Sequence, residues 1–510
     1  MSERKIGAFL SYVNIAITII VQLVYTPIML RILGQNEFGV YSLSNSIVAY
    51  LGLLNFGFSG SYLKFYSKYK LNHDILSIKK LNAVYFIVFA FISVLICLGG
   101  YGLIQNIDLI IDRSFTSDEV KLTKILMVIM TVNMAVMMPN NVFTSITVAH
   151  EKFIFSKSLS LLQTLGNPCL SLPVLLLGYG SKGMSIVLLL LSVISLIINA
   201  FYCKQKLNVG FEFHNIDWTI MKEILSFSIF IFIWSIVDQL NWQVGKLILA
   251  NFIGSTAVAI YTVGMQFTNL FIVFSTAISG VFNPQIYSYV YERNACEKLT
   301  DLMIKVGRLQ FYLVFYIWIT YVVFGKCFIK LWAGPGYNEA YYIGLLLMTP
   351  IMIALLQNTG IEILRAFNKH QMRTAVHFIM GVINVIISIP LTKMYGIFGC
   401  AIGSCISTFI SSTLVSNYFY VKVIKLNMKR FFKAIIRLYK VVSLNILIAI
   451  FVRQFCTLES WEELCIYGTA FSVIYIIICI KYGFNDYEDN LLKQAINKFR
   501  KIDFKNIVRR

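Results

Sequence analysis

Charged residues are scarce in this chain. Asp, Glu, Lys and Arg make up 13% of its 510 residues, whereas hydrophobic residues make up 58%. A water-soluble domain of this composition would have too little polar surface to cover its apolar residues. The shortage of charge therefore excludes a soluble globular protein and predicts an integral membrane protein.

Residues that hold metals or carry out acid–base catalysis are also few. The chain has five His, and its ten Cys show no paired spacing typical of a zinc site. The loops predicted to lie outside the cell are short and hold no His. A membrane glycan polymerase or ligase needs such groups gathered at an extramembrane site. We therefore expect no metal, no cofactor and no enzymatic activity.

Acidic residues are outnumbered by basic ones, 24 to 44, which gives a formal net charge of +20. Most of the basic residues fall in segments on one side of the predicted spans, and this bias marks the cytoplasmic side. It places both termini in the cytoplasm. Because the basic residues are spread over separate segments instead of lining one groove, the charge does not indicate nucleic-acid binding.

Long apolar runs recur throughout the chain. A run of about 20 residues is long enough for a helix to cross a membrane, and backbone groups in lipid must pair within their own segment. The sequence therefore predicts an all-α membrane protein with about fourteen transmembrane helices. They are centred near residues 20, 48, 92, 136, 168, 192, 240, 270, 320, 355, 385, 409, 447 and 472.

The first half of the chain resembles the second. Ile32–Tyr41 aligns with Phe252–Tyr261, Asn167 and Pro173 with Asn384 and Pro390, and Tyr179–Gly183 with Tyr395–Gly399. Six helices are an even number, so the second copy enters the membrane from the same side as the first. Two parallel-repeat six-helix bundles of the kind found in transporters are the expected result.

This repeat sets the expected domain boundaries. A six-helix bundle is expected over residues 1–205, a cytoplasmic linker over 206–223, and a second six-helix bundle over 224–421. Two helices without a counterpart follow over 422–482, and a basic cytoplasmic tail over 483–510. Apolar residues at helical spacing in this tail predict a helix that lies on the inner lipid surface.

Two opposite charges stand in one apolar stretch, Val237–Gly264. This stretch reads as the outer half of a helix, a very short turn and the start of the next helix. Asp238 and Lys246 are eight residues apart, too far for a direct local salt bridge. Because intramembrane charges are costly, Lys246 is a candidate for a substrate cavity and Asp238 for a cation or proton site. For Lys246, a structural pair with another helix is the alternative.

Four other charged residues lie in or near predicted spans. Glu362 and Arg365 are one helical turn apart, where a local ion pair competes with a functional role. Arg31 and Lys64 stand near helix ends, where snorkelling to lipid headgroups competes with substrate binding. We take Arg31, Lys64 and Arg365 as further substrate-binding candidates and Glu362 as a second ion-coupling candidate.

Short motifs in both halves resemble those of one transporter family. They are Arg31–Gly34, Phe38–Tyr41, Phe56–Phe58 and Lys64 in the first half, and Gly254–Tyr261, Asn283–Pro284 and Tyr395–Gly403 in the second. Their order and spacing over about residues 5 to 421 resemble the polysaccharide repeat-unit (O-antigen and capsule, Wzx-like) flippases of the MOP superfamily. One departure is Lys64, where relatives often have Arg, which binds phosphate in a bidentate way.

The resemblance implies a fold and a function. Two bundles would enclose a V-shaped central cavity, and alternating access would move undecaprenyl-diphosphate-linked oligosaccharide from the inner to the outer leaflet of the bacterial cell membrane. The implied partners are this lipid-linked substrate, membrane lipids, sodium or protons, and a glycan polymerase. A multidrug or cation antiporter of the same superfamily is the alternative. Four basic candidates against two acidic ones favour an anionic cargo.

Overall fold

The structure is a computed structural model, and it describes residues 3–111, 115–214, 228, 232–233, 235–367, 369–455 and 459–501. These residues form helices and short turns and contain no β-strand, so the predicted all-α class is confirmed. They pack into two compact units, each built from two stretches of chain. Unit 1 comprises Met1–Val263 and Thr374–Ser407, and unit 2 comprises Gly264–Arg373 and Thr408–Arg510.

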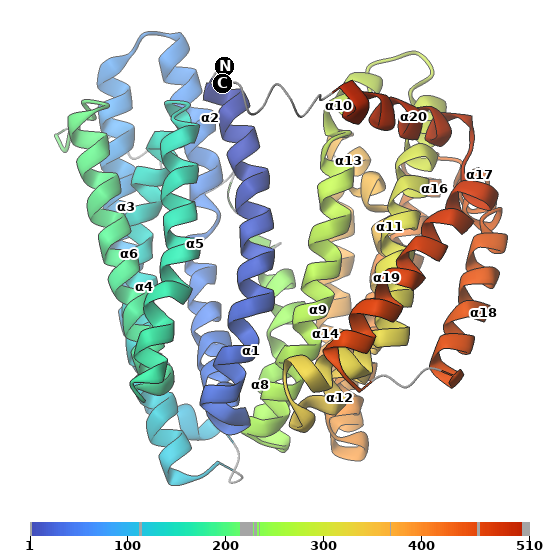
Figure 1. Ribbon diagram of the computed structural model, residues 1–510. Helices are drawn as coiled ribbons and strands as arrows, with labels where there is room; N and C mark the ends of the chain where they lie inside the picture. The colour runs from blue at the N-terminus through green and yellow to red at the C-terminus, as the bar shows by residue number, and fades with distance from the viewer. Residues whose placement is uncertain are drawn as a thin grey trace. The chain divides into compact units, whose positions relative to one another are not determined.

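Unit 1 is a bundle of long helices that stand roughly side by side (Figure 1). Its helices are α1 (Glu3–Leu51), α2 (Phe58–Leu71), α3 (Ile75–Gln105), α4 (Ser117–Ala149), α5 (Phe153–Leu176), α6 (Gly180–Gln205) and α8 (Val244–Phe252). It also holds the start of α9 (Ser255–Gly280), most of α14 (His370–Tyr395) and most of α15 (Ile397–Thr408).

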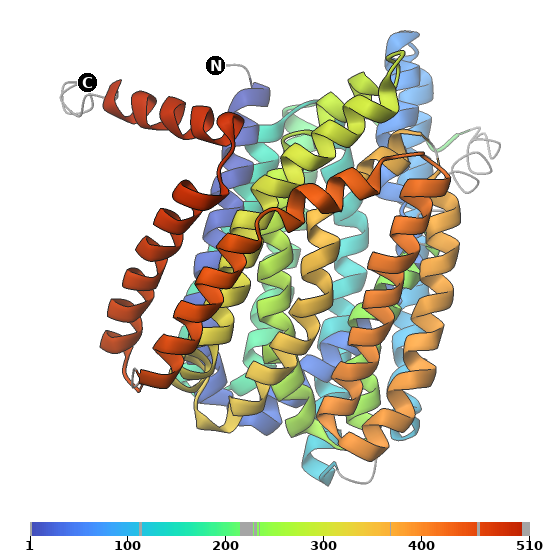
Figure 2. The same cartoon turned by 90° about the vertical axis from the view of Figure 1, so that its right-hand side faces the viewer.

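Unit 2 contains the rest of α9 and the helices that follow it, apart from α14 and α15. They are α10 (Asn283–Tyr289), α11 (Ala295–Trp332), α12 (Asn338–Leu356), α13 (Asn358–Ala366), α16 (Ser416–Lys422), α17 (Met428–Ile436), α18 (Tyr439–Phe455), α19 (Trp461–Ile478) and α20 (Asp486–Lys501). Two π-helical segments, Phe409–Val415 and Cys479–Gly483, adjoin α16 and α19. Figure 2 shows α20 lying crosswise at one end of the unit.

The described residues contain 11 helices that are long and apolar enough to cross a membrane, or 12 if the bent pair α17 and α18 is one span. The predicted count of about fourteen is not confirmed. The runs centred near residues 20 and 48 fall in one continuous helix, α1, which is broken only at Gly34 with φ 73°. The run centred near residue 240 lies partly outside the described residues. The predicted V-shaped cavity stays a prediction.

Several positions that the sequence pairs between the two halves share a conformation. Gly34 and Gly254 both have positive φ, as do Gly180 and Gly396, so each breaks the helix in the way glycine allows. In α5 the Asn167 side chain accepts a hydrogen bond from the serine four residues later, and Asn384 in α14 does the same. These likenesses concern single positions, and the repeat of whole bundles stays a prediction.

Candidate functional site

Lys246 lies in α8, the short helix that ends just before the turn at Gly254. Its side chain is buried, with 8% of its surface exposed. In the described part of the chain its Nζ has one polar partner, the Oε1 atom of Gln243, at 3.4 Å. A buried ammonium normally has an anionic partner or several strong acceptors, because leaving water costs free energy. Lys246 has a single long contact with a neutral amide.

Asp238 lies eight residues before Lys246, in a different environment. Its side chain is exposed and contacts the side chain of Trp242. The helix turn between the two charges is irregular at Gln243, immediately before α8 begins. The side chains of Asp238 and Lys246 form no ion pair with each other, and the groups that each of them would bind stay a prediction.

Lys64 lies on α2, which follows a break in the helical chain. Phe56 and Gly57, just before α2, have the left-handed φ values 47° and 70°. The Lys64 side chain is exposed, and its Nζ is 5.7 Å from the centre of the Phe65 ring. Arg31 lies on α1, three residues before the Gly34 break, and is also exposed. Arg31 thus lies about one turn before a break in regular helix, and Lys64 about two turns after one.

Glu362 and Arg365 pair with each other on α13, in unit 2. The Arg365 Nη1 atom is 2.7 Å from Glu362 Oε1, and 48% of the Arg365 side chain and 21% of the Glu362 side chain are exposed. This is the local ion pair that the spacing allows. Glu362 would have to release Arg365 before it could bind a coupling cation, and Arg365 would have to release Glu362 before it could bind a phosphate.

The turns at Gly34 and Gly254, both in unit 1, contact each other. The Thr256 hydroxyl donates to Asn36 Oδ1 at 2.8 Å, and a Cβ on Gly39 would overlap the Ser255 carbonyl oxygen. Ser255 also donates to Glu119 Oε1 at 2.6 Å. Asn36 and Thr256 occupy equivalent positions in the aligned stretches Ile32–Tyr41 and Phe252–Tyr261. The structure therefore brings together the two turns that the sequence alignment pairs.

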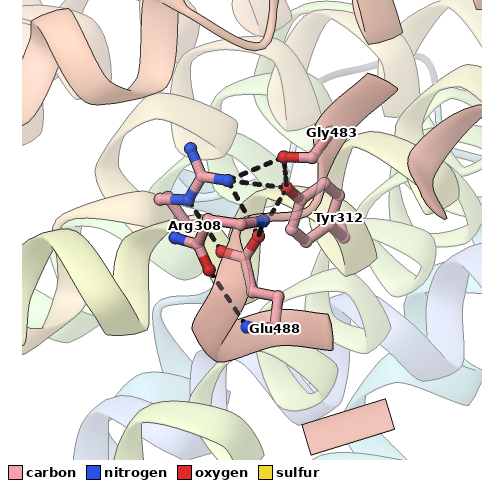
Figure 3. Close-up of polar contacts among 5 residues, drawn as sticks. Arg308, Tyr312, Gly483 and Glu488 are labelled. Atoms are coloured by element: carbon pink, nitrogen blue, oxygen red, sulfur yellow. Dashed lines mark hydrogen bonds and ion pairs between the residues drawn. The ribbon is translucent and has the colours of Figure 1, made fainter. Parts of the chain in front are cut away.

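Two buried arginines were not among the sequence candidates. Arg308 on α11 binds Glu488 of α20 through Nε at 2.7 Å and Nη2 at 2.8 Å, and its Nη2 also donates to the Gly483 carbonyl at 2.7 Å (Figure 3). Arg373, at the start of α14, donates from Nε to Ser416 Oγ at 3.3 Å and is 7% exposed. Glu488 and Gly483 are 180 and 175 residues from Arg308, and Ser416 is 43 residues from Arg373, so no local spacing indicates these contacts.

Among the described residues, no group of three or more His, Cys, Asp or Glu could hold a metal ion.

The six candidate residues predicted from the sequence are divided between the two units. Arg31, Lys64, Asp238 and Lys246 belong to unit 1, and Glu362 and Arg365 belong to unit 2.

The chain shares its fold with solved transporters. The structure of the lipid II flippase MurJ in an inward closed conformation has a TM-score of 0.73 at 15% identity, and the match covers 94% of this chain and 98% of that one. An inward-facing multidrug-resistance MATE transporter of the MOP superfamily has a TM-score of 0.59 at 15% identity, covering 82% and 99%. At this identity the likeness shows the fold alone.

Relatives and a protein family are found by sequence. A candidate O-antigen transporter of Shigella flexneri is 19% identical over 76% of this chain and 90% of its own length. The uncharacterized membrane protein EpsK of Bacillus subtilis is 21% identical over 93% of this chain and 94% of its own. The family described as "Polysaccharide biosynthesis protein" matches residues 6–290, more than half of the chain. The chain therefore belongs to the polysaccharide biosynthesis protein family, and it shares its fold with the MurJ flippase and with a MATE transporter of the MOP superfamily.

Proposed function

We propose that this protein is a flippase that moves undecaprenyl-diphosphate-linked oligosaccharide repeat units from the inner to the outer leaflet of the bacterial cell membrane. Membership of the polysaccharide biosynthesis family supports a role in making surface glycan. The observation that carries the proposal is Lys246, a cation with 8% of its surface exposed and one long contact with an amide. A diphosphate would supply the missing anion.

The task of moving a lipid-linked sugar across the membrane explains why a buried cation such as Lys246 is retained. The sugar head of a lipid-linked oligosaccharide cannot cross hydrocarbon unaided, whereas its isoprenoid tail already lies in lipid. Intramembrane charges cost about 3 kcal/mol each on insertion scales, so an unpaired one is retained where it has a function. We assign Lys246 to the diphosphate, together with Arg31, Lys64 and, after it releases Glu362, Arg365.

We propose alternating access coupled to sodium or protons as the mechanism. Asp238 is the first candidate for the coupling ion because its carboxylate is exposed, and Glu362 is the second. The product would be delivered to the outer leaflet, where a glycan polymerase consumes it, with both termini of the flippase in the cytoplasm. The protein itself makes and breaks no covalent bond in this scheme.

Export in living cells tests the cargo. Deleting the gene should trap lipid-linked oligosaccharide in the inner leaflet, and Lys246→Ala and Arg31→Ala should abolish surface glycan while the protein stays in the membrane. The control is Lys182→Ala, an exposed lysine on α6, which should leave surface glycan unchanged. Normal surface glycan in both site variants would overturn the assignment of Lys246 and Arg31 to the diphosphate.

A crosslink tests alternating access. Asn36→Cys and Thr256→Cys place thiols on the two outer turns that now share a hydrogen bond. Joining them with a short reducible reagent should stop export, because an outward-open state requires these turns to part, and reductant should restore it. The control pair, Asp118→Cys and Lys121→Cys, lies within one helix turn of α4. Undiminished export by fully crosslinked 36/256 protein would refute the movement.

A further inference from the structure

Unit 2 contains a pocket unconnected with the six candidate residues. Its volume is about 360 Å³. It is formed where the end of α11, the start of α12 and the end of α18 meet, next to Glu459. Figures 1 and 2 show the start of α12, the end of α18 and the start of α19 at the same end of the unit. The charge distribution of the sequence predicts that this end faces the outside.

Three cationic side chains line the pocket. Lys326 and Lys330 are four residues apart on α11 and therefore share a face, and Arg453 reaches the pocket from α18. All three are exposed, and across the described ranges none of the three side chains forms an ion pair or hydrogen bond. They outnumber the one carboxylate in the lining, that of Glu459. The pocket thus has an excess of positive charge and donors without partners.

A neutral polar group completes the lining. The Oδ1 atom of Asn338, the first residue of α12, is buried without a hydrogen-bond partner. The amide of the same side chain can donate from its nitrogen to an oxygen-rich anion. Tyr341, by contrast, already donates its hydroxyl hydrogen to the Val322 carbonyl at 2.9 Å. The available donors are therefore the two lysines, Arg453 and Asn338.

The aromatic residues near the pocket favour a position at headgroup depth. Trp461, which begins α19, is exposed, and its ring centroid lies 5.7 Å from that of Phe328 on α11. Tyr342, next to the lining residue Tyr341, is exposed. Trp and Tyr collect at membrane–water interfaces, the level at which lipid phosphates lie. At this level Lys and Arg side chains can form charge-assisted hydrogen bonds with lipid phosphates.

We propose that this pocket binds the phosphate headgroup of an anionic phospholipid, such as phosphatidylglycerol. Arg453 holds the phosphate through its planar guanidinium, Lys326 and Lys330 neutralise it, and Asn338 donates to a remaining oxygen. The bound lipid fixes α11, α12 and α18 together at this end of unit 2. The site is independent of the proposed cargo, because it uses none of the residues assigned to the diphosphate.

Amine acetylation of the purified full chain tests the site residue by residue. The protein is placed in nanodiscs of phosphatidylcholine, with or without phosphatidylglycerol, and the acetylation of each lysine is read by mass spectrometry. Phosphatidylglycerol should slow the acetylation of Lys326 and Lys330 about fivefold relative to that of Lys121 and Lys124. These two lysines of α4, one exposed and one half-buried, lie on the same predicted face and pair with Asp118 and Asp108.

Variants and a soluble anion separate the explanations. Arg453→Gln should abolish the protection of both lysines although it removes neither of them, whereas Lys182→Gln, which removes an equal charge elsewhere, should preserve it. Equal slowing at all four lysines would refute the pocket and leave only a general surface potential. Protection by inorganic phosphate in pure phosphatidylcholine, matching that by phosphatidylglycerol, would overturn the lipid assignment in favour of a free anion.

Discussion

Arg308 and Lys246 are equally buried, each with 8% of its surface exposed, yet their surroundings differ completely. Arg308 has a bidentate carboxylate, the Gly483 carbonyl at 2.7 Å and the Tyr312 hydroxyl at 3.1 Å (Figure 3). Lys246 has one amide oxygen at 3.4 Å. A cation whose donors are all used holds helices together, whereas a cation with unused donors is available to a ligand. Burial by itself does not distinguish the two.

The arginine cluster fixes the C-terminal helix. Glu488, 3% exposed, also accepts from the Asn485 backbone N–H at 2.9 Å and thereby caps α20, while the Lys305 Nζ lies 3.9 Å from the centre of the Tyr487 ring. These contacts join α11 to the first turn of α20. The predicted C-terminal helix is confirmed as far as Lys501, and its position on the inner lipid surface stays a prediction.

The largest expected effect on stability comes from separating this pair. Arg308→Met leaves the Glu488 carboxylate buried without its partner, and Glu488→Gln leaves the guanidinium in the same state, so each should lower the free energy of unfolding by about 3–5 kcal/mol. Thermal unfolding of the purified protein in detergent measures it. The double variant Arg308→Met/Glu488→Met is the control and should recover most of the loss. Equal instability of the double variant would mean that packing is the cause.

A smaller effect of opposite sign is expected at Lys246. Lys246→Met keeps the volume of the side chain and removes a buried ammonium that has no anionic partner, so the free energy of unfolding should rise by about 1 kcal/mol. Export of surface glycan should nevertheless be lost. The same thermal assay, run beside the export assay, separates the two readouts. A loss of stability like that of Arg308→Met would make Lys246 a structural residue like Arg308.

The smallest effect is expected at the exposed pair on α13. Arg365→Gln removes an ion pair with 48% of the arginine side chain exposed, and such pairs contribute about 0–1 kcal/mol. The melting temperature should therefore stay close to that of the unchanged protein, whereas export should fall if Arg365 binds the diphosphate. Lys182→Gln is again the matched control. Unchanged export would leave Arg365 with the local ion pair alone.

Much of the fold could be predicted because membrane helices obey local rules. An apolar run of about 20 residues specifies a span wherever it occurs. Positive φ at Gly254 follows from a residue that can adopt it, so the turn lies within the stretch where the sequence predicts it, and the aligned Gly34 also has positive φ. The same rules could not show that α1 continues past Gly34, or that Gly39 in the same helix packs closely against Ser255 from a distant part of the chain.

The candidate site was predictable only in part. Lys246 stands out in the sequence because a charge within an apolar run is rare, and the structure shows it to be buried. The pairing of Glu362 with Arg365 follows from their spacing. Arg308 was missed because its partners, Gly483 and Glu488, are more than 170 residues away. The basic pocket was missed for the same reason, since Arg453 and Lys326 belong to distant helices.

The sequence by itself determined that this is a helical membrane protein, where most of its helices lie, and which charges stand within apolar runs. These properties depend on residue type and on spacing along a single helix, so a one-dimensional pattern contains them. Only the tertiary structure decided which buried cation is paired and which is not. That distinction depends on carboxylates and carbonyls contributed by distant segments, whose proximity arises from packing and leaves no periodic trace in the chain.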